Sequence, residues 1–202
     1  MAISALLIAP SSSPYADALV EDVSEIEVVR HGMTPREGIF DLIFFMIHAD
    51  RGISQEEIDT YNRIRELQIP TLILVSISHN EKVVEQDHWD FDDVVMLINR
   101  VLEKVVTPFL VLHDDHGAPV GLYYLAQDAV IDYSAENPQL TVADPELSEV
   151  VAEFKSEFDE EEFVIDDFLT GLRAVAIPYI PERNIGTNEV KSYITKLRQA
   201  RL

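Results

Sequence analysis

Three consecutive serines follow the first apolar run of the chain and could do chemistry there. The run covers residues 3–9 (ISALLIA) and ends at Pro10, and Ser11–Ser13 come next. Hydroxyls and amides at a helix N-terminus can bind an anion, and Arg30 with His31 would assist such a site. Serine also caps helices without binding any ligand, and we favour this simpler interpretation.

A second candidate lies at the end of another apolar run. Residues 71–77 (TLILVSI) predict a buried strand, and His79 and Asn80 follow it. Ligands in open α/β folds bind beyond the carboxyl ends of the strands. A small-ligand pocket or a reused active site near Ser11–Ser13, Arg30 and His79 is therefore one hypothesis. An ordinary polar loop is the other, and we favour it.

Metal and nucleophile chemistry have weaker signals. His113, Asp114, Asp115 and His116 are of metal-ligating types, but successive side chains in a tight turn point apart. Followed by Gly117, the same residues are typical of a hairpin turn. The sequence contains no G-x-S-x-G elbow, and no spacing pairs a serine with a histidine. We predict no metal, no cofactor and no catalytic residue.

The elements that must position these residues alternate between strands and helices, which is typical of parallel α/β units. A capping box begins at Ser54, and Trp89 precedes another helix, where it could anchor an interface or staple the helix to the core. The predicted strands are residues 3–9, 25–29, 40–48, 71–77 and 172–180, the hairpin is 109–125 with a further short strand at 129–133, and helices cover 15–23, 90–105 and the C-terminus.

An acidic segment follows the hairpin. Residues 144–167 keep an apolar stripe that includes Leu147, Val151 and Phe158, so we predict one folded helix with a charged face. Its acidic residues either form a solvated face or contact a protein partner. The candidate contact residues are Glu149, Glu153, Glu157, Glu160 and Glu161.

The order of these pieces resembles the GTP-binding domain of bacterial elongation factor G and the ribosomal protection proteins. The stretch FDLIFFMIHADRGISQEEIDTYNRIRELQIPTLILVSISHN resembles the family's strand, turn, helix and strand before its guanine loop. The hairpin and the acidic part resemble its inserted subdomain, and IPYIPERNIGTNEVKSYI resembles its last strand and helix. The resemblance implies a P-loop GTPase-like α/β fold, with a mostly parallel sheet flanked by helices. The core would comprise residues 1–105 and 172–202. Residues 106–171 would form an inserted α+β subdomain, made of the hairpin and the acidic helices.

The nucleotide signatures of that family are missing. In the segment that corresponds to the phosphate loop, Pro14 removes a backbone donor, Tyr15 replaces the lysine, and Ala16 cannot ligate Mg²⁺.

The position of the guanine loop shows the same loss. Ser76, Ile77 and His79 stand where the family has its Asn, Lys and Asp. We therefore predict that no residue binds a nucleotide.

Composition limits the partners. The 202 residues include 37 acidic and 15 basic residues, a net charge of -22, and no cysteine. Such a chain repels nucleic acid and anionic membranes, although the acidity also fits simple solubility or a salt-rich cell interior. We expect a cytoplasmic protein without disulfides.

These observations predict a non-catalytic pseudo-GTPase domain that binds a protein, a basic or ribosome-associated one, without direct contact to nucleic acid or membrane. The alternative is a divergent enzyme or small-ligand binder that reuses the carboxyl edge of the sheet. A third hypothesis is a subunit that self-associates.

Overall fold

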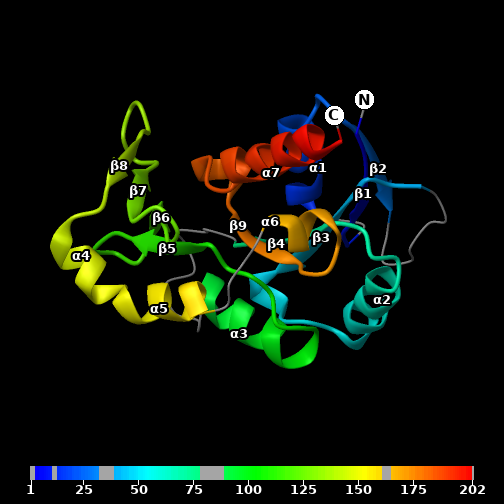
Figure 1. The fold of residues 1–202 in the computed structure, drawn as a ribbon, viewed down its shortest axis with the longest axis horizontal. Coiled ribbons are helices and arrows are strands. Elements are labelled where there is room, and N and C mark those ends of the chain that lie inside the picture. The colour runs from blue at the N-terminus through cyan, green and yellow to red at the C-terminus, as the bar shows by residue number, and fades with distance from the viewer. Residues whose placement is uncertain (1–2, 11–12, 32–38, 78–88, 161–164, 202) are drawn as a thin grey trace.

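A five-stranded parallel sheet forms the centre of the molecule (Figure 1). The computed structural model describes residues 3–10, 13–31, 39–77, 89–160 and 165–201. The strands are β1 (Ser4–Ile8), β2 (Glu27–His31), β3 (Leu42–His48), β4 (Thr71–Ser76) and β9 (Val175–Tyr179), in the order β2-β1-β3-β4-β9. All four neighbouring pairs are parallel.

The sequence of the central strands explains their position. Every residue of β3 and β4 is buried, and both strands read as nearly continuous apolar runs. Parallel strands covered on both faces have this character, because neither face alternates with solvent. In the register, Phe44 of β3 lies opposite Leu72 of β4, and Leu74 lies opposite Ile177 of β9.

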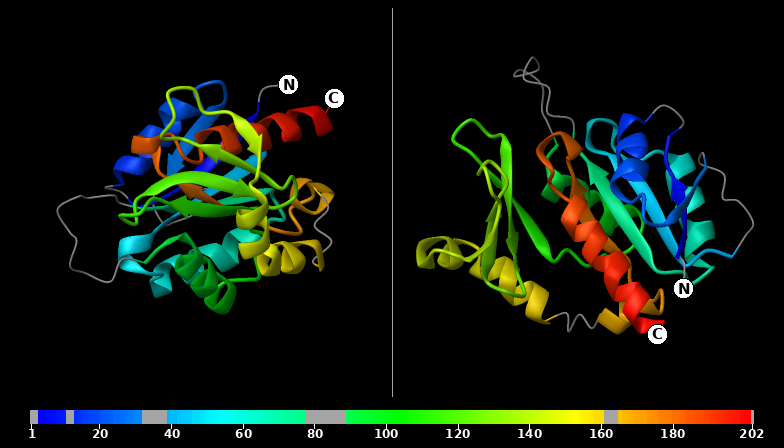
Figure 2. Two further views of the ribbon diagram at one scale, coloured as in Figure 1. Left: turned by 90° about the vertical axis from the view of Figure 1, so that its left-hand side faces the viewer. Right: turned by 90° about the horizontal axis from the view of Figure 1, so that it is seen from above.

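Helices cover both faces of the sheet (Figures 1 and 2). Helices α1 (Pro14–Asp22) and α7 (Thr187–Ala200) lie on one face, and α2 (Gln55–Arg65) and α3 (Phe91–Val101) lie on the other. The predicted capping box is confirmed: the Ser54 side chain accepts from the amide of Glu57, whose carboxylate accepts from the Ser54 amide. This exchange satisfies two amides that would otherwise lack partners at the start of α2.

A second, antiparallel sheet lies beside the first. It consists of β5 (Phe109–His113), β6 (Pro119–Tyr124), β7 (Ala129–Asp132) and β8 (Leu140–Val142). Its apolar face forms a small core of its own, made of Leu110, Tyr123, Leu125, Ala143 and Val151. The predicted fold class, a parallel α/β sheet flanked by helices with an added antiparallel unit, is confirmed.

The predicted division at residue 106 stays a prediction. Phe109, Val111 and Leu122 of the second sheet belong to the main apolar core, and Val106 bridges to Val175 of β9. The two sheets therefore share buried surface. Further elements are α6 (Ile165–Leu169) and two 3-10 turns, Ala49–Arg51 and Pro181–Arg183.

The prediction of one helix over residues 144–167 is wrong. The structure has α4 (Pro145–Val150) and α5 (Ala152–Glu160), with α6 beginning at Ile165. The backbone leaves helical geometry at Val151 (φ -92°, ψ 5°), although Leu147, Val151 and Phe158 of the expected stripe all pack in the small core of the second sheet. Val150 is exposed while Val151 is buried.

The second strand also differs slightly from its prediction. It covers residues 27–31 rather than 25–29, and it pairs with β1 from Glu27 onward. Within the described part of the chain, no helix has the length and apolar character that crossing a membrane requires.

Candidate functional site

The strand order identifies one edge of the sheet as the place where a ligand would bind. From β1 the chain first adds β2 on one side and then returns to add β3 on the other. The segments that follow β1 and β3 therefore run in opposite directions from the carboxyl ends of these two strands. Open α/β folds bind ligands at such a place. Three side chains meet at this edge: Tyr15 at the start of α1, His48 at the end of β3, and Ser76 at the end of β4.

His48 and Ser76 form a buried polar pair. The exposed fractions are 5% for His48 and 1% for Ser76, and His48 Nδ1 lies 2.8 Å from Ser76 Oγ. The Ser76 hydroxyl donates to the carbonyl of Ile47 at 3.2 Å, so we assign Nδ1–H of His48 as the donor to Ser76. His48 Nε2 has no hydrogen-bond partner among the described residues.

The surroundings keep the imidazole of His48 neutral. Burial lowers the pKa of His48 below its ordinary value, and the positive charge of Arg51 lowers it further. Desolvation penalises the charged form of a buried histidine. A neutral ring with an unprotonated Nε2 follows from both observations.

Tyr15 covers this pair. Its side chain is 9% exposed, and the centroids of the Tyr15 and His48 rings lie 5.4 Å apart at an angle of 46°. Pro14 and Tyr15 occupy the first turn of α1, and Ala16 behind them is fully buried. The space beyond β1 and β3 is therefore occupied by an aromatic ring of the chain itself.

Ser13 acts as the predicted helix cap. Its side chain accepts from the amide of Ala16 at 3.3 Å, and its hydroxyl lies 3.4 Å from the Met46 sulfur. The Ser13 amide donates to the Pro10 carbonyl at 3.1 Å. Every hydrogen-bonding group that Ser13 could offer as a donor is thus engaged within the chain.

Arg30 is an ion-pair residue. Its guanidinium pairs with Asp17 of α1 and donates to the Ser13 carbonyl at 3.3 Å. Ser11, Ser12, His79 and Asn80 lie outside the described residues.

Ile77 is partly buried against the main core, as its apolar side chain favours. The structure thus brings Ser13, Arg30 and Ser76 to one edge of the sheet. It adds His48, which the sequence analysis missed. The available signal was a histidine ending a seven-residue strand of otherwise apolar side chains.

The hairpin turn has a structural role. Asp114 Oδ1 accepts from the amides of His116 at 2.8 Å and Ala118 at 2.9 Å, and these bonds lower the pKa of Asp114. Gly117 has φ +78°, which favours glycine. Among the described residues, no three His, Cys, Asp or Glu side chains form a group that could hold a metal ion.

The acidic candidates lie on two helices rather than one. Glu149 belongs to α4 and Glu153 to α5, and both are exposed. The side chains of Glu157 and Glu160, and the whole of Glu161, lie outside the described residues. Trp89 is exposed just before Asp90, the N-cap of α3.

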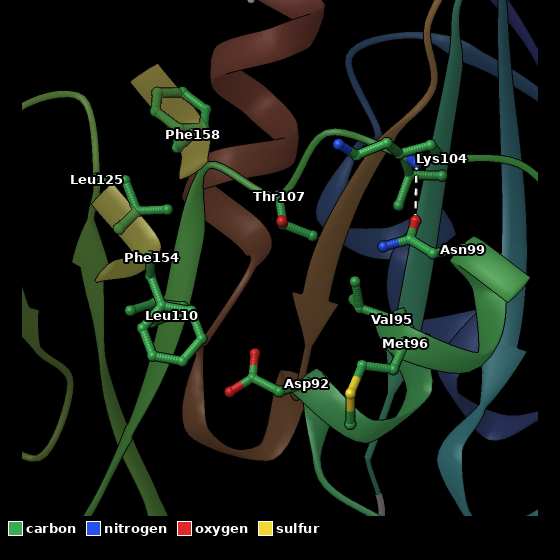
Figure 3. Close-up of a pocket in the computed structure, with 11 residues that line it drawn as sticks. Asp92, Val95, Met96, Asn99, Lys104, Thr107, Leu110, Leu125, Phe154 and Phe158 are labelled. Carbon is green, nitrogen blue, oxygen red and sulfur yellow. Dashed lines mark hydrogen bonds between the residues drawn. The ribbon is translucent and has the colours of Figure 1, made fainter. Parts of the chain in front are cut away.

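A groove lies between α3, the second sheet and α5 (Figure 3). Its volume is about 530 Å³. One wall carries Asp92, Val95, Met96 and Asn99 of α3, the opposite wall carries Leu110, Leu125, Phe154 and Phe158, and Lys104 and Thr107 lie at one end. Val105 also lines the groove. The sequence analysis did not predict this groove.

Comparison with known proteins supports the fold. No model of a known protein family matches the chain, and no curated protein matches it. Among solved structures, a protein of Thermus thermophilus superposes with a TM-score of 0.69 at 15% sequence identity. The match covers 96% of this chain and 40% of that protein's chain, so the likeness concerns the fold alone.

Proposed function

We propose that this chain is a non-catalytic domain that keeps the α/β architecture of a nucleotide-binding protein, has lost nucleotide binding, and acts by binding another protein. The observation that carries the proposal is the packing of Tyr15 against His48 at the switch point of the sheet. The side chain that occupies the ligand position belongs to the chain itself.

The start of α1 offers little to a phosphate. Phosphate binding at a helix N-terminus requires free backbone amides and a nearby cation. The Ser13 amide donates to Pro10, Pro14 has no amide proton, and the Ala16 amide donates to the Ser13 hydroxyl. The nearby cation, Arg30, is paired with Asp17.

The exposed apolar side chains support a protein-binding role. Met96, Val150 and Phe154 are exposed on α3, α4 and α5, and Trp89 is exposed at the start of α3. Apolar groups that gather on neighbouring elements mark interaction surfaces more often than scattered ones do. The resemblance to elongation factor G favours a translation-related partner, and the net charge of -22 favours a basic one.

The hydrogen bond between Ser76 and His48 is the observation that favours the alternative of an enzyme. A hydroxyl 2.8 Å from an imidazole nitrogen has the geometry of a nucleophile and its base. Both residues are buried, however, and the Ser76 hydroxyl donates to Ile47. We therefore assign the pair a structural role.

Affinity capture tests the proposed protein binding. The chain, immobilised through a terminal tag, is exposed to a native lysate, and each enriched protein is purified and titrated against the chain by calorimetry. We expect at least one protein to bind directly with a defined stoichiometry, and ribosomal or translation-factor proteins would support the inferred ancestry. If no enriched protein binds directly, the protein-binding role is wrong.

A further inference from the structure

The groove of Figure 3 continues into exposed apolar surface. Met96 is 64% exposed on one side of the groove, and Phe154 is 48% exposed on the other. The apolar side chains of Val95, Leu110 and Leu125 also line the groove. A flexible methionine and an aromatic ring at the rim of a groove suit an apolar side chain of a partner, because methionine adapts its shape.

One face of helix α3 packs in the main core, and another face lines this groove. Phe91, Val94 and Ile98 are buried in the main core. Asp92, Met96 and Asn99 follow a second stripe with spacings of four and three residues, and all three line the groove. None of the three belongs to the main core, although the Asn99 side chain accepts a hydrogen bond from the Val105 amide at 2.9 Å.

Asp92 places a carboxylate in the groove that takes no part in the cap of α3. Asp90 and Asp93 form the capping box of α3, in which each carboxylate accepts from the backbone amide of the other. Asp92 takes no part in this cap, and its carboxylate points from α3 toward the opposite wall (Figure 3). Burial and the charges of Asp90 and Asp93 raise the pKa of Asp92 to about 6. No cation pairs with Asp92 in the part of the chain that the structure describes.

We propose that the groove between α3 and α5 binds a basic amphipathic helix of a partner protein, with an apolar side chain between Met96 and Phe154 and a Lys or Arg on Asp92. Helices bind to grooves in this way through apolar residues spaced three and four apart. Three carboxylates lie at the Asp92 end, while Lys104 at the other end already has a partner. The negative charge at the Asp92 end of the groove therefore favours a basic partner. This proposal rests on the proposed protein-binding function and names the chemistry of the partner.

A synthetic helix tests the proposal without knowledge of the natural partner. The probe is a fluorescent, amidated peptide of about 18 residues, roughly five turns, with leucines on one face and lysines on the other. Its matched control has the same composition with the leucines spread around the helix. Binding to the whole chain is measured by fluorescence anisotropy at about 0.15 M salt, where long-range attraction is screened beyond about 8 Å.

The variants are chosen in matched pairs. Asp92→Asn and Met96→Ser change the groove, and Asp115→Asn and Leu172→Ser make the same kinds of chemical change at exposed positions outside its lining. We expect each groove variant to weaken the binding of the amphipathic peptide about tenfold, as truncation of one of the few dominant contact residues of an interface does. The two control variants should bind as the unchanged chain does. Circular dichroism confirms that all four variants fold.

Three results would overturn the proposal. In the first, the scrambled peptide binds as well as the amphipathic one. In the second, Asp115→Asn weakens binding as much as Asp92→Asn does. Either result would mean that net charge alone attracts the peptide. A concentration-dependent dimer that Met96→Ser abolishes would mean that a second copy of the chain occupies the groove. Tight binding of a guanine nucleotide would contradict the proposed function but leave these peptide results unchanged, so the two failures are distinguishable.

Discussion

At the residue scale, the ligand edge of the sheet is filled by a buried histidine and an aromatic ring. His48 keeps one nitrogen bonded to Ser76 and the other without a partner among the described residues. An unpaired buried acceptor costs about 1–3 kcal/mol, and a buried imidazolium would cost more. Tyr15 packs against the same ring, with the two ring centroids 5.4 Å apart.

Acidification should therefore destabilise the protein through His48. The folded pKa of His48 lies below its ordinary value of 6.5, so the unfolded chain binds more protons there than the folded one. The contribution of His48 to stability is intact above about pH 6.5 and is lost as the pH falls through that value toward the folded pKa. Urea titrations of the unchanged chain and of His48→Asn at about pH 7.5 and about pH 5.5, on either side of the ordinary histidine pKa, measure the effect.

The unchanged chain and His48→Asn have the same carboxylates. The difference between their losses of stability on acidification therefore reports on His48 alone. We expect a smaller loss of stability on acidification in His48→Asn than in the unchanged chain. The exposed His113 serves as the control, and His113→Asn should retain the full pH dependence. Equal pH dependence in His48→Asn and the unchanged chain would show that His48 is not a buried neutral group.

At the element scale, Glu189 joins the second sheet to α7. Its side chain is buried, and it accepts hydrogen bonds from the hydroxyls of Tyr124 in β6 and Tyr133 just after β7, the latter at 2.8 Å. Burial and the charge of Glu189 raise the pKa of both tyrosines. Because β5 supplies Leu110 to one wall of the groove and pairs with β6, this cluster helps to fix that part of the wall.

Removal of Glu189 should cost more than removal of one tyrosine hydroxyl. We expect Glu189→Ala to lower the free energy of unfolding by about 2–3 kcal/mol, because two buried hydroxyls lose their acceptor. Tyr133→Phe alone should cost about 1 kcal/mol, and much less in the Glu189→Ala background. Chemical denaturation of the single and double variants gives the coupling. If the losses in the free energy of unfolding for Glu189→Ala and Tyr133→Phe simply add in the double variant, the two side chains do not act as one cluster.

The sequence was informative about elements whose signals are local. The strands β3 and β4 are continuous apolar runs, and the Ser54 capping box and the buried stripe of α3 can each be identified within a few residues. The break at Val151 was missed, because the apolar spacing continues across it. The groove was missed because it is lined by residues far apart in the chain, such as Asp92 and Leu125 on its opposite walls.

The candidate site at the sheet edge was partly predictable for the same reason. The aromatic residue Tyr15 and the cap at Ser13 are properties of single positions in the sequence. The contact between Tyr15 and His48 is not, since it requires β1 and β3 to lie side by side.

At the scale of the whole molecule, a parallel α/β sheet is combined with a groove beside the second, antiparallel sheet. The order β2-β1-β3-β4-β9 has a switch point, and Tyr15 fills the space beside it. Exposed apolar side chains include Met96 on α3, Val150 on α4 and Phe154 on α5, and others lie elsewhere, among them Val142 and Leu172. With a net charge of -22, electrostatic attraction favours basic protein partners over nucleic acid.

The most direct measurement of the central claim is a calorimetric titration of the unchanged chain with GTP and GDP, with and without Mg²⁺. Nucleotide is added to about 1 mM, a concentration that detects even binding energies near 4 kcal/mol. A competent GTPase domain measured in the same buffer serves as the positive control. We predict no heat beyond dilution for either nucleotide. Micromolar binding that depends on Mg²⁺ would contradict the account.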